Sequence, residues 1–111
     1  MADEPSVAGR FDLKFAKIDT GDATGAGVNL IAADPTKQIR VISLYLAVGA
    51  AISVRFRSAT TDISGPTPLA ANGGLSVPTD IGIFQTQRNE ALNILASGIA
   101  QIGGAIAYIL I

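Results

Sequence analysis

The chain of 111 residues contains few side chains that could do chemistry. It has no histidine and no cysteine, which excludes Ser-His and Cys-His nucleophile pairs, thiolate metal sites and disulfides. Nine Asp and Glu residues remain, and most stand beside Gly, Pro, Thr or Asn, where turn formation explains them. We therefore expect no catalytic residues, no cofactor and no metal, and a protein that is not an enzyme.

Three short segments contain part of a ligand-binding pattern. The glycine-rich TGDATGAG at residues 20–27 lacks the Gly-Lys-Ser/Thr ending of a phosphate-binding loop. Asp19 and Asp22 could contact calcium, but no third carboxylate follows at the spacing of a calcium loop. Glu90 has no second carboxylate beside it for acid–base catalysis. A solvent-exposed loop or turn is the simpler interpretation of each segment.

The composition also limits the partners. Hydrophobic residues make up 49% of the chain and charged residues 15%, with a net charge of −1. This balance favours neither nucleic acid nor an acidic membrane surface. The first ten residues contain Asp3 and Glu4 in place of the basic region that opens a secretory signal peptide.

The last 21 residues, 91–111, contain no charged side chain and are long enough for a membrane-spanning helix. Such a helix would contain Gly98, Gly103 and Gly104 in its interior and would lack basic residues at its end. We interpret the segment as a hairpin of two strands, 91–97 and 105–111, joined by a glycine-rich turn. It is then part of a core, and no membrane is expected.

Period-two alternation indicates strands elsewhere in the chain. Residues 11–18 and 52–57 each alternate apolar and polar side chains, while residues 39–48 are apolar on both faces. The last two segments flank Gly49 and Ala50, so we expect them to form a hairpin. Residues 59–80 hold three of the five prolines and predict a long connection.

Seven or eight short strands without a convincing helix predict an all-β protein. We expect a single-domain antiparallel β-sandwich, jelly-roll-like, formed by residues 28–111. Residues 1–27 are expected to form an extended N-terminal arm with one strand and a glycine-rich loop. That strand could add to the sheet of a neighbouring subunit or pair within its own sheet, and the sequence does not decide between them.

Strands this apolar, with few charges at their edges, favour a permanent neighbour. The candidate assembly contacts are Phe11, Leu13 and Phe15, which share one face of the arm strand. Arg55 and Arg57 are further candidates, because they could meet an acidic partner surface. The alternative for both arginines is a plain solvated strand face, which also prevents stray edge pairing.

From residue 28 onward the chain contains the segments KQIRVISLYL, AISVRFRS, SGPTPLAANGGL and GIFQTQRNEALNILASGIAQIGGAIAYI. Through these segments it resembles small structural proteins of tailed-phage virions, with Asn89 where similar chains read Gly before Glu-Ala-Leu. The resemblance implies a capsid decoration (cement) protein located in the virion and assembled in the host cytoplasm. The implied partners are further copies of the chain, with a trimer favoured, and the major capsid protein or other virion proteins. Head surface, fibre base, neck and tail all remain open as positions.

The alternative is a receptor- or carbohydrate-binding sandwich module of a phage fibre, neck or tail. In that case residues 59–80 would form the binding loop. Carbohydrate sites usually place aromatic side chains beside polar groups, and this loop contains no Trp, Tyr or Phe. The decoration protein is therefore the favoured hypothesis.

Overall fold

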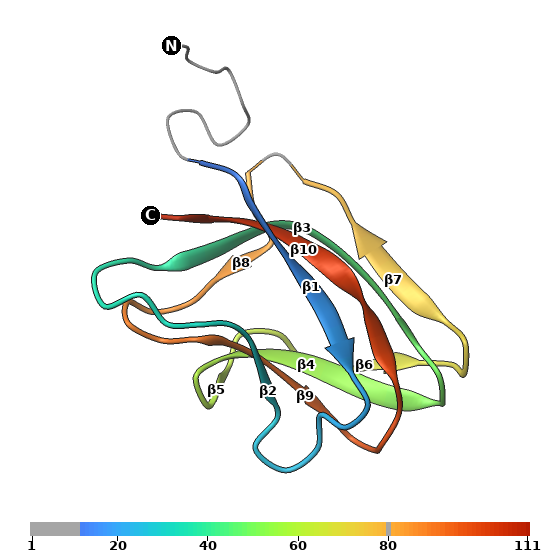
Figure 1. Ribbon diagram of the computed structural model, residues 1–111. Coiled ribbons are helices and arrows are strands. Elements are labelled where there is room, and N and C mark those ends of the chain that lie inside the picture. Colours follow the sequence, from blue (N-terminus) through green and yellow to red (C-terminus); the bar gives the residue numbers. More distant parts are fainter. Residues whose placement is uncertain (1–11, 80) are drawn as a thin grey trace.

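The computed structural model describes residues 12–79 and 81–111, which form ten strands and no helix (Figure 1). The strands make two five-stranded sheets in which every pairing is antiparallel. The sheets pack face to face around one hydrophobic core. The predicted all-β, single-domain sandwich is confirmed.

Each sheet has a continuous path of four strands and one short strand paired beside it. The first sheet contains, in spatial order, β1 (Lys14–Thr20), β10 (Ile102–Leu110), β3 (Ile39–Val48) and β7 (Gly74–Val77), with β8 (Phe84–Gln85) also on β3. The second contains β2 (Val28–Ile31), β9 (Leu92–Ala96), β4 (Ile52–Ser58) and β5 (Thr61–Asp62), with β6 (Thr67–Leu69) also on β4.

The chain repeatedly crosses from one sheet to the other, and the first and last strands, β1 and β10, are neighbours. This strand order is the jelly-roll arrangement. It corrects the hairpin expected at residues 39–57, because β3 and β4 lie in different sheets. Both strands have an apolar side to bury, and they bury it against each other across the core. The connection at residues 49–51 therefore joins the two sheets.

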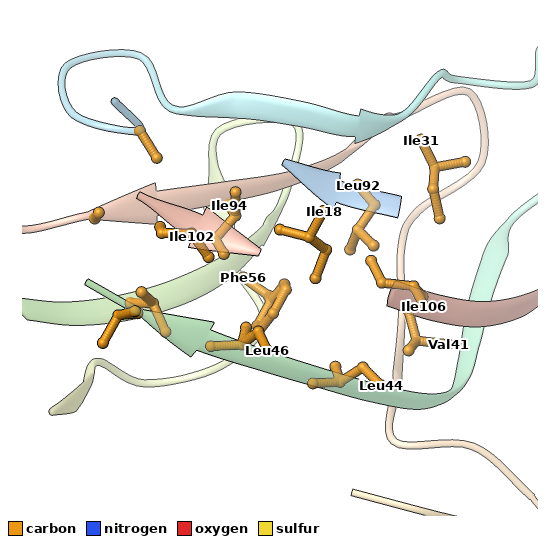
Figure 2. Close-up of a cluster of buried hydrophobic side chains, with 14 of the residues drawn as sticks. Ile18, Ile31, Val41, Leu44, Leu46, Phe56, Leu92, Ile94, Ile102 and Ile106 are labelled. Atoms are coloured by element: carbon orange, nitrogen blue, oxygen red, sulfur yellow. The ribbon is translucent and has the colours of Figure 1, made fainter. Parts of the chain in front are cut away.

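The core is built from the inward side chains of both sheets (Figure 2). On β4, Ile52, Val54 and Phe56 are buried while the residues between them are partly exposed, as the alternation predicted. The Phe56 ring packs on that of Phe84 from the first sheet, with centroids 5.1 Å apart. Side chains from five strands point toward one another in Figure 2, namely Ile18, Val41, Leu44, Leu46, Phe56, Leu92, Ile94, Ile102 and Ile106.

The strand expected in the N-terminal arm belongs to the sandwich. β1 pairs with β10 from Lys14 to Thr20, and Ile18 is only 2% exposed in the core. This is the second of the two alternatives, pairing within the chain's own sheet, and the sandwich extends from residue 14 instead of residue 28. Residues 1–11, including Phe11, lie outside the described residues.

The charge-free closing stretch forms β9 and β10. Nowhere in the described part of the chain is there a helix long and apolar enough to cross a membrane. The turn between the strands is shorter than expected, because Gly103 and Gly104 lie inside β10. A Cβ on Gly104 would overlap the Tyr45 carbonyl oxygen of β3. This glycine therefore permits close strand approach and is not part of the turn.

Candidate assembly interface

Strand register places a set of small side chains on the outward side of the first sheet. Phe15 on β1 stands opposite Ala107 on β10, which stands opposite Ser43 on β3. In the next outward row, Lys17 on β1 stands opposite Ala105, which stands opposite Tyr45. The residues between them along β10 and β3, such as Ile106 and Leu44, are buried in the core. The outward rows therefore form a flat strip of Ala and Ser with aromatic side chains beside it.

Two aromatic side chains project from this surface into solvent. Phe15 is 73% exposed and Tyr45 is 58% exposed. Between them lies a shallow groove of about 240 Å³, lined mainly by Phe15, Tyr45, Ser43, Ala105, Ala107 and Pro78. Leu13, two residues before Phe15, is also exposed. We call the surface made by these seven residues the apolar outer face.

Charge is confined to the margins of this sheet. The segments 41–54, 63–79 and 91–111 contain no Asp, Glu, Lys or Arg. On the strands of the first sheet, the charged residues are Arg40 at the start of β3 and three residues of the edge strand, Lys14, Lys17 and Asp19. Loss of charge together with enrichment in aromatic residues is the composition of a protein–protein interface core.

The outward side of the second sheet is polar. Across its strands stand Asn29, Asn93, Arg57 and Asp62 in successive register. The Arg57 Nε donates to Asn93 Oδ1 at 3.0 Å, and its Nη2 donates to the Ala26 carbonyl at 2.7 Å. Arg55 forms an ion pair with Asp62 at 2.8 Å. Both candidate arginines therefore bond within their own chain.

The five candidate contacts predicted from the sequence do not form one site. Leu13 and Phe15 lie on the outward side of the first sheet, whereas Arg55 and Arg57 lie on the outward side of the second. Phe11 lies outside the described residues. Of these candidates the structure brings only Phe15 to the groove, since neither Leu13 nor either arginine is among the lining residues.

Tyr45 is the main residue of this face that sequence reasoning missed. Strict alternation along residues 39–48 predicts that Tyr45 lies on the same side as Ile39 and Val41, yet those two are buried and Tyr45 is exposed. The register of β3 against β10 shifts between Ala107 and Tyr108, where β3 contains Ile42 as one extra residue. This bulge reverses which side the later residues face. The alternation of Ser43, Tyr45 and Ala47 with Leu44, Leu46 and Val48 was the available signal.

The other polar groups have structural roles. Every buried side-chain N or O atom in the described residues has a hydrogen-bond partner. The hydroxyl and backbone N–H of Thr24 both donate to Asp22, which lowers the pKa of this carboxyl below its usual value. Within the described residues no group of three or more Asp or Glu side chains is placed to hold a metal ion.

No protein-family model, no curated protein and no solved structure matches this chain. The jelly-roll arrangement occurs in proteins of unrelated function, so the fold by itself assigns none. The surface described above and the resemblance of residues 28–111 are the grounds on which a function can be proposed.

Proposed function

We propose that the chain is a structural protein of a tailed-phage virion, a capsid decoration protein. It binds the head surface as a homo-oligomer, with a trimer favoured, and stabilises the particle. The observation that carries the proposal is the apolar outer face, a sheet surface with two exposed aromatic side chains and with charged residues only at its margins. Such an exposed surface favours contact with another protein.

The two outward surfaces suit this role because they differ. One sheet presents an apolar surface, and covering that surface with another protein lowers the free energy of the system. The other presents Arg55, Arg57 and Asp62, which are bonded within the chain and suited to remain hydrated. A decoration protein needs a rigid scaffold with surfaces for association and needs no active site.

The resemblance supplies the virion part of the proposal. Its motifs fall on β3, β4, β9 and β10, the strands that build most of the core. They are packing and turn motifs, so they support a shared scaffold and do not specify a position on the particle. The trimer is favoured because decoration proteins often occupy threefold positions.

The test is made on particles of the phage that encodes the chain. Mass spectrometry of purified particles should find the chain in a fixed ratio to the major capsid protein. Particles that lack the chain should break open at a lower temperature, and added purified chain should restore the wild-type value. Particles that contain none of the chain, or that are equally heat-stable without it, would contradict the proposal.

Recognition of a receptor or carbohydrate is the second candidate. One observation favours it: the groove places Phe15 and Tyr45 beside the serines Ser43 and Ser76. Aromatic side chains beside hydroxyl groups are typical of carbohydrate sites. Binding of the purified chain to host-cell glycans, with loss of binding in Tyr45→Ala, would support this candidate over the first.

A further inference from the structure

The apolar outer face contains both halves of a contact. Phe15 projects from the edge strand β1, and a groove of matching character lies beside it on the same sheet. We infer that this face is the contact between copies of the chain, in which Phe15 of one copy enters the groove of another. The inference rests on the proposed homo-oligomer and names the surface that forms it.

The groove can accept a phenyl ring. An apolar cavity of about 150 Å³ is sufficient to bind benzene, and this groove measures about 240 Å³. Ala105, Ala107 and Ser43 line it with short side chains, so an incoming ring meets little obstruction. The ring would lie against Phe15 and Tyr45 of the receiving copy, and aromatic pairs add about 0.5–1.5 kcal/mol beyond the area they bury.

The charges favour a second copy over a charged partner. Away from Lys17 and Asp19 on the edge strand, a charged group brought onto this face would lose water without gaining an opposite charge, which is costly. A second copy brings the same uncharged surface. At the margin of the face, Lys17 Nζ and Asp19 Oδ2 lie 3.9 Å apart. Because these side chains have opposite charges, the margin of one copy can pair with the margin of another.

The area of the face sets the strength of the contact. The strands of the first sheet contain 32 residues, and each covers about 16 Å² of the sheet plane, so roughly 500 Å² is the upper limit for the face. A standard interface takes about 800 Å² from each partner, and weaker ones take less than about 600 Å². We therefore expect the copies to associate reversibly, with an oligomer fraction that depends on concentration.

The test compares three variants of the full chain by sedimentation velocity over a concentration series. Phe15→Ser should raise the dissociation constant at least tenfold, the loss of about 1.4 kcal/mol expected for an anchoring aromatic side chain. Ala107→Leu should act similarly by filling the groove. Ile99→Ser is the matched control, because Ile99 is 71% exposed in the loop between β9 and β10 and does not line the groove. It should associate like the wild type.

Circular dichroism and melting temperature should be unchanged in all three variants, because the substitutions are made on exposed or open positions. Wild-type association in both Phe15→Ser and Ala107→Leu would overturn the inference. Normal association of Phe15→Ser combined with lost particle binding would also overturn it, since the face would then dock on the capsid and the proposed function would stand. Association that depends on Phe15 in a chain that never binds particles would support the inference and contradict the proposed function.

Discussion

At the scale of single residues, a polar network fixes the loop between β1 and β2 to the second sheet. Asn93 is 4% exposed, and its Nδ2 donates to Asn29 Oδ1 at 3.0 Å and to the Ala26 carbonyl at 3.3 Å. Arg57 supplies the donor for the Asn93 oxygen. Gly27 passes directly over this group, so a Cβ there would lie 2.5 Å from both Asn93 Oδ1 and the Ile94 carbonyl oxygen.

Gly27→Ala should destabilise the protein more than Gly25→Ala does. Both glycines have positive φ, 76° and 70°, so each substitution incurs about 1–2 kcal/mol of backbone strain. Only Gly27 is crowded, since nothing lies within 4 Å of a Cβ at Gly25. Overpacking should add about 1–3 kcal/mol at Gly27. Urea unfolding of the two variants measures the difference. Equal losses in the free energy of unfolding would show that the polar network rearranges to accept the added Cβ and would contradict this prediction.

The carboxylate of Asp34, in the loop between β2 and β3, should make the stability of the fold depend on pH in the acid range. The Thr36 backbone N–H donates to Asp34 Oδ1 at 2.9 Å and holds the pKa of Asp34 below its usual value of 3.8. A carboxyl with a lowered folded-state pKa stabilises the fold at pH above 3.8 and loses this contribution as pH falls through the folded value. The free energy of unfolding of Asp34→Asn should therefore approach that of the wild type as pH falls below 3.8. A constant difference between the two proteins over this range would contradict this origin.

At the scale of elements, the sequence predicted strands better than their partners. The strict alternation over Ile52, Val54 and Phe56 placed the buried side of β4 correctly, because period two is a local property. The two expected hairpins were wrong, since β3 with β4 and β9 with β10 are divided between sheets. A short turn between two half-apolar strands fits a hairpin and a crossing between sheets equally well. The choice is made by packing across the core, to which residues far apart in the chain contribute.

Val54→Asp should be severely destabilising. Val54 is 1% exposed at the centre of β4, and a buried carboxylate without a partner should cost about 4 kcal/mol or more. This loss approaches the whole stability of an ordinary domain, so the variant could fail to fold. Val54→Ala, with an expected cost of roughly 2 kcal/mol, tests the same burial in a folded protein. Ser53→Asp on the outward side is the control. Melting of Val54→Asp close to that of Ser53→Asp would contradict the assigned orientation.

Two truncations should distinguish the contribution of β1 to folding from that of residues 1–11. Removing residues 1–20 deletes Ile18 from the core and uncovers the edge of β10, so we expect loss of cooperative unfolding. Removing residues 1–11 takes away none of the described contacts and should leave the sandwich folded. Thermal unfolding followed by circular dichroism distinguishes the two. A stable fold after removal of residues 1–20 would mean that β1 is dispensable, as an arm would be.

At the scale of the whole molecule, the sandwich presents one apolar and one polar outward surface. Leu13 and Phe15 could be selected from the sequence because they alternate with polar residues in a short segment. Tyr45, Ala105 and Ala107 could not, because their place beside Phe15 depends on the register of three strands and on the bulge at Ile42. The arginines were chosen for their charge, and the structure pairs them within the chain. Charge distribution in three dimensions, more than any motif, distinguishes the two surfaces.

The central claim is that the chain is an assembly protein whose apolar outer face holds copies together. Native mass spectrometry of the full chain over a concentration series tests it most directly. The account predicts species at whole multiples of 11.3 kDa, which become more abundant as concentration rises. A chain that remains monomeric at every concentration up to the millimolar range would contradict it.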